Sequence, residues 1–321
     1  MSSRFLAVVL CVFSIYLLFS PTISQARSVL LSVGIDNYTL TGCTALSNAV
    51  NDATNIVNEL ANYSVMWTER EILTEAEAKT ASIRSRIQTL ATELTDGDTF
   101  FYFHSAHGGN TTGASPFWYL CCEDDIYRDS QLAADLAGFS SEVKVVVVTH
   151  ACYSGGLFKS SGGSGSFEFG KSVLEELNRI RSSLKAPMAG HVGFIASSQE
   201  DQSSWATSTQ GIFVKHFLNA ISLGDVNSDG TVTFLEAFNY AKQPTIDELT
   251  ALGKTQIPVT DNADVLEVVA LRQYGSNELN EKLSSGCAVN EDYEGERGWV
   301  LYLPILLLLT VAIFRRTMKV T

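Results

Sequence analysis

Residues 100–109 read FFYFHSAHGG, and residues 145–156 read VVVVTHACYSGG. Each stretch begins as an apolar run that predicts a buried strand, and each ends in a reactive side chain followed by glycines, which predict a tight turn. Open parallel α/β sheets place their active sites at the carboxyl ends of their strands. We therefore expect His107 and Cys152 to lie at the same edge of such a sheet.

Strands and helices are predicted to alternate along the rest of the chain. Further short apolar runs that predict strands lie at residues 29–35, 69–73, 191–197, 256–259 and 265–271. Helical periodicity of the apolar positions covers residues 45–63, 78–94, 131–139, 173–183 and 211–222. This alternation predicts an α/β fold with a doubly wound, mostly parallel sheet.

His107 and Cys152 together suit acyl transfer. A thiol is a good nucleophile only when it is deprotonated, and a nearby imidazole can accept its proton. The reaction also needs donors for an oxyanion, which backbone N–H groups in glycine-containing turns supply. A buried Cys alone is usually a core residue, but the pair at matching strand ends predicts a catalytic dyad. His104 lies within its strand, so we expect it to be a packed core residue.

These segments resemble the catalytic core of the caspase/metacaspase superfamily of cysteine peptidases. Residues 103–109 are similar to the Ser-Gly-His-Gly segment of that family, and residues 150–156 to its Asp-x-Cys-x-Ser-Gly segment. Similarity extends over roughly residues 29–245. The resemblance implies a caspase-like three-layer α/β/α sandwich and endopeptidase activity through an acyl-thioester. It also implies an oxyanion hole formed by the N–H groups of Gly108 and Cys152.

One departure from the family pattern concerns the specificity pocket. Metacaspase-like members carry an Asp two residues before the nucleophile, where it lines the pocket for Arg or Lys, but this chain has His150 there. The resemblance places Asp36 and Ser197 in the same pocket. Neutral or acidic residues before the scissile bond become candidates, as in the asparagine-specific legumain relatives.

Residues 225–236 (DVNSDGTVTFLE) satisfy the pattern of an EF-hand calcium loop. The expected Ca²⁺ ligands are the side chains of Asp225, Asn227, Asp229 and Glu236 and the backbone carbonyl of Thr231. The alternative is an Asp/Asn/Gly turn that binds no metal. A lone site of this kind in a secretory compartment predicts a structural ion rather than a sensor.

Apolar segments at both ends predict insertion into a membrane. Residues 1–26 have the charge, apolar stretch and small-residue cleavage pattern of a secretory signal peptide, with an uncleaved anchor as the alternative. Residues 299–314 predict a transmembrane helix, because Arg315 and Arg316 follow as the positive-inside rule requires. A lipid-anchor signal is the rival interpretation.

The predicted organisation is therefore that of a single-pass type I membrane protein. A luminal or extracellular catalytic domain covers residues 27–286, a juxtamembrane linker covers residues 287–298, and a cytosolic tail covers residues 315–321. The formal net charge of −13 and the lack of a basic patch in the sequence argue against a nucleic-acid partner. Sequons allow N-glycans at Asn37, Asn62 and Asn110.

Cysteine usage agrees with an oxidising compartment. Removal of the signal peptide leaves an odd number of cysteines, so we expect one free thiol, and Cys152 is the best candidate. Cys121 and Cys122 are adjacent and are not expected to pair with each other. Each would pair with Cys43 or Cys287, and the sequence leaves that connectivity open.

Taken together, the sequence predicts a membrane-anchored, calcium-binding cysteine endopeptidase that acts on peptides or proteins. Two alternatives stay open: a transamidase of the lipid-anchor attachment type, and a catalytically inactive caspase-like receptor or scaffold. Residues 159–171 are rich in Gly and Ser, and we interpret them either as an activation loop or as an ordinary surface loop.

Overall fold

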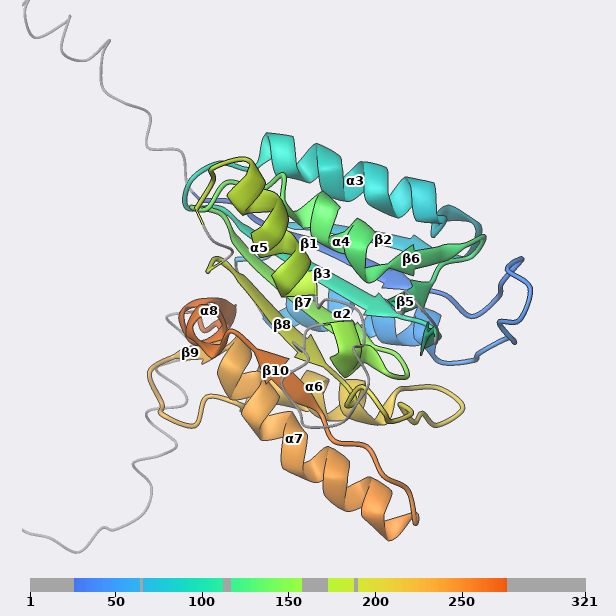
Figure 1. Ribbon diagram of the computed structural model, residues 1–321. Coiled ribbons are helices and arrows are strands. Elements are labelled where there is room, and N and C mark those ends of the chain that lie inside the picture. Colours follow the sequence, from blue (N-terminus) through green and yellow to red (C-terminus); the bar gives the residue numbers. More distant parts are fainter. Residues whose placement is uncertain (1–25, 64–65, 112–116, 158–172, 188–189, 276–321) are drawn as a thin grey trace, which may run out of the picture. The chain divides into compact units, whose positions relative to one another are not determined.

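A six-stranded sheet lies at the centre of the fold, and five of its strands are parallel (Figure 1). The computed structural model describes residues 26–275 except 64–65, 112–116, 158–172 and 188–189. The strand order is β10-β8-β7-β3-β1-β2, with β10 antiparallel to β8. The strands are β1 (Ser28–Gly34), β2 (Glu69–Thr74), β3 (Thr99–Ser105), β7 (Lys144–His150), β8 (Val192–Ala196) and β10 (Val259–Asp261).

The central strands read as continuous apolar runs because both of their faces are buried. Successive side chains of a strand point to opposite faces. On β3, Phe100 and Tyr102 therefore pack in one hydrophobic core, and Phe101 and Phe103 pack in the other. All four aromatic side chains are fully buried.

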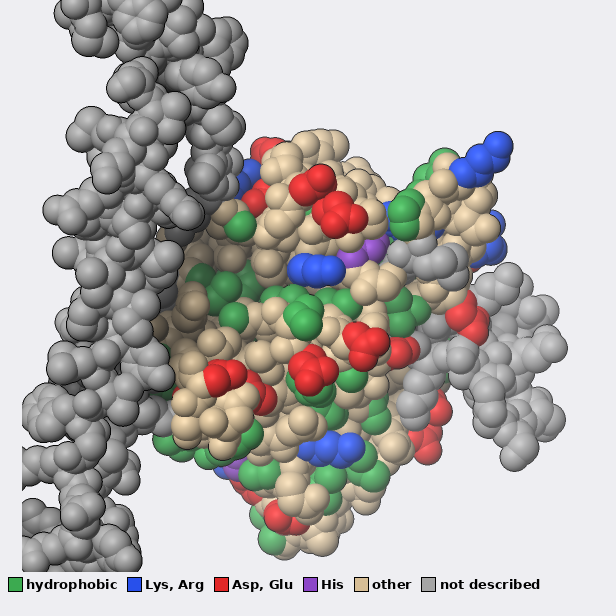
Figure 2. All heavy atoms as spheres, turned by 90° about the vertical axis from the view of Figure 1, so that its left-hand side faces the viewer, with side chains coloured by type: hydrophobic (Ala, Val, Ile, Leu, Met, Phe, Trp, Pro, Cys, Tyr) green, Lys and Arg blue, Asp and Glu red, His purple; other side chains and the backbone are tan. Residues whose placement is uncertain are grey.

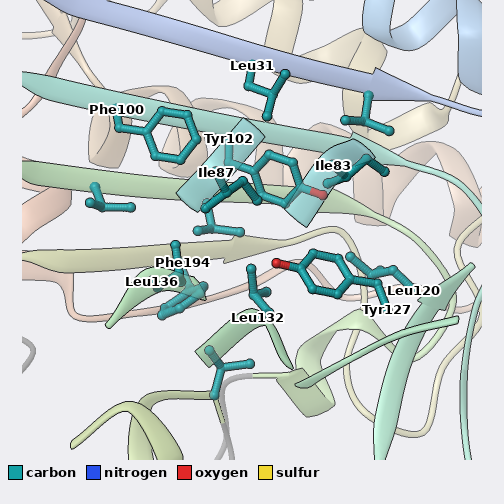
Figure 3. Packing of buried hydrophobic residues seen from close by; sticks show 14 of the residues in the cluster. Leu31, Ile83, Ile87, Phe100, Tyr102, Leu120, Tyr127, Leu132, Leu136 and Phe194 are labelled. Atoms are coloured by element: carbon teal, nitrogen blue, oxygen red, sulfur yellow. The ribbon is translucent and has the colours of Figure 1, made fainter. Parts of the chain in front are cut away.

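Helices cover both faces of the sheet and complete a three-layer α/β/α sandwich (Figure 1). One layer contains α3 (Thr80–Glu93), α4 (Asp129–Leu136) and α5 (Val173–Ser183). The other contains α2 (Ala49–Tyr63), α6 (Ile212–Leu223), α7 (Phe234–Ala251) and α8 (Ala263–Val268). Figure 3 shows the first core, where Tyr102 lies close to Ile87 of α3 and Leu132 of α4 belongs to the same cluster. The predicted α/β fold with a largely parallel sheet is confirmed.

Two small sheets and two short helices were not predicted. An antiparallel sheet follows the end of β3 and contains β4 (Gly108–Asn110), β5 (Trp118–Cys121) and β6 (Ile126–Arg128). A second sheet pairs β9 (Thr231–Thr233) with β11 (Ala270–Gln273), and the 3-10 helices are η1 (Glu75–Glu77) and η2 (Ser154–Leu157). Strands of three or four residues are too short to show a periodic pattern.

Several predicted elements have different bounds or type in the structure. The strand predicted for residues 256–259 is displaced toward the C-terminus and forms β10 at Val259–Asp261. The helix predicted for residues 45–63 begins only at Ala49, because Asp36 Oδ1 accepts the Ala49 N–H at 2.8 Å and residues before it form a loop. The strand predicted for residues 265–271 is wrong over its first half, where Val265 and Leu266 lie in α8 and pack as buried helical residues. A short apolar run does not distinguish a strand from a buried helical turn.

Several predicted segments lie outside the described residues. They are almost all of the signal peptide, the juxtamembrane linker with Cys287, the transmembrane segment, the cytosolic tail and the Gly/Ser-rich loop. Within residues 26–275, apart from the gaps given above, no helix combines the length and the hydropathy needed to cross a bilayer.

Three histidines are buried in the fold and carry lowered pKa values. Burial lowers the pKa of His104, His150 and His191 to about 4 in each case. His104 is fully buried, with Nδ1 2.6 Å from the Tyr102 hydroxyl, which agrees with its predicted packing role. Both ring nitrogens of His191 lack a hydrogen-bond partner among the described residues. Each imidazole is therefore neutral in the folded protein at neutral pH.

We expect the protein to lose stability as the pH falls from about 6.5 to about 4. An unfolded His titrates near pH 6.5, so over this range the unfolded chain binds more protons than the folded one. Asp52, whose pKa burial raises to about 7, acts in the opposite sense between about pH 4 and 7, as do Asp129 and Asp261, whose pKa values burial also raises. Of these three carboxyls only Asp52 has a large shift, so the three imidazoles set the sign. Denaturant unfolding at several pH values measures how steeply the free energy of unfolding changes with pH. His191→Phe should reduce this slope by up to about 1.4 kcal/mol per pH unit, and an unchanged slope would contradict the assignment.

Candidate active site

The carboxyl ends of β3 and β7 bring His107 and Cys152 to one cavity. The two strands are adjacent and parallel, with Ser105 opposite His150 in the register. The Ala106 N–H donates to the His150 carbonyl at 3.2 Å, which extends the pairing beyond the strand ends. A cavity of about 360 Å³ opens at this edge, and both His107 and Cys152 line it. Residues 45–48, which precede α2, form another part of its wall.

The imidazole of His107 is held by the loop between β1 and α2. Its Nε2 lies 2.8 Å from the Thr44 carbonyl oxygen. Because a carbonyl only accepts, the neutral ring carries its hydrogen on Nε2 and leaves a lone pair on Nδ1. The Tyr38 ring packs against the imidazole with centroids 5.3 Å apart, and the Tyr38 hydroxyl accepts the His107 backbone N–H at 3.1 Å. The loop thus sets both the tautomer and the ring position.

Cys152 lies in a tight turn after β7. Its Sγ is half-buried and is 3.4 Å from the Ser204 backbone N, which donates to it. The next residue, Tyr153, has φ of 58°, in the left-handed region that non-glycine residues rarely adopt. The turn is held in this shape because the Tyr153 N–H donates to the Gln202 carbonyl at 2.8 Å. The thiol can in turn donate to the Ser204 carbonyl oxygen, which lies 3.8 Å from Sγ.

Gly108 packs directly against the backbone of Cys152. A Cβ at position 108 would lie 2.5 Å from the Cys152 carbonyl oxygen and 2.9 Å from the Ala151 Cβ. Real Cβ atoms essentially never approach other atoms so closely, so this position requires glycine. The two residues predicted to form the oxyanion hole therefore belong to backbone segments in close contact.

A buried His–Asp pair lies at the inner end of the cavity. His150 lines the cavity, and its Nδ1 is 3.6 Å from Asp52 Oδ2. Asp52 is fully buried and accepts hydrogen bonds from the Ser105 hydroxyl at 2.8 Å, the Asn48 amide at 3.1 Å and the Gly211 N–H at 2.9 Å. Burial raises the pKa of Asp52 to about 7 and lowers that of His150 to about 4.

Asp52 was not identified as a site residue from the sequence, although a signal for it exists. It occupies the same face of its helix as Ala49, Ala53 and Ile56, which are all buried. An acidic residue within an apolar helical face has to find buried hydrogen-bond partners. That pattern could have identified Asp52 as part of an internal polar site.

The other two residues predicted for the specificity pocket do not line the cavity. Asp36 lies at the start of α2, where its carboxylate accepts the Ala49 N–H. Ser197 is buried at the end of β8, and its hydroxyl is 2.5 Å from that of Ser204, which does line the cavity. Ser197 therefore contacts the cavity wall through a neighbour.

The predicted calcium loop connects α6 to α7, as an EF-hand requires. Asp225 is buried, and its carboxylate accepts the N–H groups of Asp229 at 3.2 Å and Gly230 at 3.3 Å. Glu236 Oε2 instead accepts the Thr233 N–H at 2.9 Å and caps α7. Across the described part of the chain, no group of three or more His, Cys, Asp or Glu side chains is placed to hold a metal ion. The loop has the helix–loop–helix frame, but its carboxylates are not gathered.

The remaining predicted residues have different surroundings. Asn37 and Asn62 are exposed, whereas Asn110 is half-buried at the end of β4. On the face shown in Figure 2, Lys and Arg side chains are interspersed with Asp and Glu and form no contiguous basic patch.

Comparisons with known proteins agree on the fold. A family model described as the caspase domain matches residues 27–268. No curated protein matches the chain. A protein of solved structure from Geobacter sulfurreducens is 17% identical with a TM-score of 0.55, and the alignment covers 78% of this chain and 100% of that one. Caspase-1 from Spodoptera frugiperda is 14% identical with a TM-score of 0.50, with 75% and 90% covered. At these identities the structural likeness concerns the fold alone.

Proposed function

Because the chain belongs to the caspase-domain family, we propose that it is a cysteine endopeptidase with His107 and Cys152 as its catalytic dyad. The observation that carries the proposal is that both side chains line one cavity at the ends of the adjacent strands β3 and β7. Gly108, whose backbone lies against Cys152, supports the accompanying assignment of the oxyanion hole.

The proposed reaction follows from the hydrogen bonds at these two residues. With Nε2 bonded to the Thr44 carbonyl, Nδ1 of His107 is the free base that takes the proton from Cys152 Sγ. The thiolate attacks the scissile carbonyl, and the N–H groups of Gly108 and Cys152 stabilise the oxyanion. The imidazolium then protonates the leaving amine. Water, activated by the same imidazole, hydrolyses the thioester and regenerates the thiol.

We expect Cys152→Ala and His107→Ala to lower peptide cleavage by about 10³-fold or more, because nucleophile and base act as one unit. A peptide acyl-type probe should label wild-type protein at Cys152 and fail to label Cys152→Ala. Cys122→Ala, which removes a buried thiol away from the cavity, is the matched control and should keep both properties.

The same assays separate the alternatives. A transamidase would join the acyl group to an added amine such as hydroxylamine in preference to water. A folded wild-type protein that neither labels nor cleaves, with or without calcium, would be the inactive receptor or scaffold and would refute the endopeptidase.

The cavity favours an uncharged residue before the scissile bond. Its lining contains no Asp, Glu, Lys or Arg side chain among the described residues. Asp52 is fully buried behind His150, and three hydrogen bonds already engage its carboxylate. Burial keeps the pKa of His150 near 4, so its imidazole is neutral at pH 7 and can exchange hydrogen bonds with a neutral polar side chain.

A peptide library should therefore show cleavage after uncharged residues, with Arg and Lys disfavoured. His150→Asp restores the acidic residue of the metacaspase-like pattern and should raise the relative kcat/KM for Arg by about tenfold or more, which corresponds to about 1.4 kcal/mol. His150→Asn, which adds no charge, is the matched control. Preferred cleavage after Arg or Lys by the wild-type protein would contradict the uncharged pocket.

A secretory, membrane-anchored location is the finer part of the proposal. The signal-like segment at residues 1–26 and the apolar segment at residues 299–314 support it. The exposure of Asn37 and Asn62 makes them the better of the three glycan acceptors. Release of the full chain from membranes by alkaline carbonate would contradict the anchor.

Structural calcium at residues 225–236 completes the proposal. Its all-oxygen donor set suits Ca²⁺, and α6 and α7 flank the loop on both sides. To bind Ca²⁺, the Glu236 carboxylate has to give up the hydrogen bonds that it accepts from the Thr233 N–H and hydroxyl. We therefore expect Ca²⁺ to stabilise the fold but to bind with modest affinity.

Calcium should raise the melting temperature of the wild-type protein by several degrees relative to chelator, because an ion that binds only the folded state stabilises it. Asp225→Asn/Glu236→Gln should abolish that shift. Asp247→Asn, at an exposed position of α7 outside the loop, is the matched control. An equal shift in wild-type and loop-variant protein would place any calcium elsewhere.

A further inference from the structure

The thiols of Cys43 and Cys121 meet beside the loop that holds His107. Their Sγ atoms are 2.7 Å apart, although the residues are 78 positions apart in the chain. Two sulfur atoms that are not bonded to each other keep a larger separation, and a disulfide joins them at about 2.0 Å. Cys43 is half-buried in the loop between β1 and α2, and Cys121 is buried at the end of β5.

We propose that Cys43 and Cys121 form a disulfide that clamps the His107-holding loop to β5. The two thiols lose two protons and two electrons as the S–S bond forms, and a disulfide such as oxidised glutathione accepts them and becomes two thiols. The secretory location proposed above would supply that class of oxidant. The sequence alone allowed Cys43 or Cys287 as the partner, and the structure selects Cys43.

Cys122 is excluded as the partner of Cys43 by its position. It is fully buried and belongs to the hydrophobic core that contains Tyr102 and Leu132. Its neighbour Cys121 has its Sγ at Cys43 instead. The pairing therefore leaves Cys122 as a core thiol and Cys152 as the thiol in the cavity.

Both ends of the crosslink are directly connected to His107. Cys43 precedes Thr44, whose carbonyl accepts the His107 Nε2–H. Cys121 donates its backbone N–H to the His107 carbonyl at 2.8 Å. The disulfide would thus fix the loop that orients the imidazole relative to the strand that anchors the His107 backbone.

Around Cys43 this loop is secured by two backbone hydrogen bonds, from the Cys43 N–H to the Leu40 carbonyl at 3.3 Å and from the Leu46 N–H to the Asp36 carbonyl at 2.8 Å. Thr41, Gly42, Thr44 and Ala45 are exposed. Gly42 has a φ of 98°, which marks a turn that glycine accommodates. Backbone hydrogen bonds from Thr39 and Leu40 to the Glu123 carbonyl tie down the residues before Cys43. A covalent link at Cys43 would restrain the half of the loop that carries the Thr44 carbonyl.

The crosslink itself is tested without any assay of activity. Full-length protein from an oxidising expression host is denatured in the presence of iodoacetamide, so that buried thiols also react, digested without reductant and mapped by mass spectrometry. We expect a linked peptide pair that contains Cys43 and Cys121, with Cys122 and Cys152 alkylated. Alkylated Cys43, or a link from Cys121 to Cys287, would overturn the proposal.

The effect on the loop is measured by hydrogen exchange. In Cys43→Ser, exchange of the amides of residue 43 and Leu46, which donate to the Leu40 and Asp36 carbonyls, should become about tenfold faster or more, because local opening no longer meets a covalent restraint. Cys121→Ser should have the same effect, and the double variant should add nothing further. Cys122→Ala is the control and should leave exchange in this loop unchanged. Additive or absent effects of the two serine variants would contradict a shared bond.

The catalytic consequence rests on the proposed function. Loss of the clamp should lower peptide cleavage by several-fold while the acyl-type probe still labels Cys152, since His107 is misoriented rather than removed. If wild-type protein shows the Cys43–Cys121 link but no cleavage or labelling, the crosslink stands and the endopeptidase fails. If cleavage occurs and no Cys43–Cys121 link is found, the endopeptidase stands and the crosslink fails.

Discussion

The in-register parallel pairing of β3 with β7 is the constraint on which the site depends. Ser105 lies opposite His150, so the chain leaves both strands at the same level and delivers His107 and Cys152 to one cavity. A shift of one residue would turn every following side chain to the other face of the sheet. The two hydrophobic cores prevent such a shift, because each strand residue has its own face to fill.

Around this pairing, short segments without periodic structure position the reactive groups. The loop before α2 supplies the Thr44 carbonyl to the imidazole, and residues 198–204 hold the Cys152 turn in its left-handed conformation. Such contacts are made by backbone atoms, which any residue carries. Sequence patterns therefore do not reveal these contacts. They nevertheless decide which nitrogen of His107 carries the lone pair and which backbone N–H is hydrogen-bonded to Cys152 Sγ.

The buried polar cluster at Asp52 links the site to the stability of the fold. Its carboxylate ties α2 to Ser105 at the end of β3, to Gly211 at the start of α6 and to His150. Burial raises the pKa of Asp52 to about 7 and lowers that of His150 to about 4, so at neutral pH the imidazole is uncharged and the carboxyl is only partly ionised. Desolvation of Asp52 and His150 therefore has two effects: it lowers the stability of the fold, and it makes the cavity better suited to binding uncharged side chains.

The sequence by itself determined the layered α/β fold and the two strand ends that carry His107 and Cys152, because apolar periodicity and glycine turns are local properties of the chain. It also indicated His150 as a departure from the family pattern. Only the tertiary structure decided that Asp52 lies beside His150, that Asp36 caps α2 instead of lining the cavity, and that Cys121 meets Cys43. These pairs join residues that are far apart in the chain, and their distances depend on how the layers pack rather than on any local pattern.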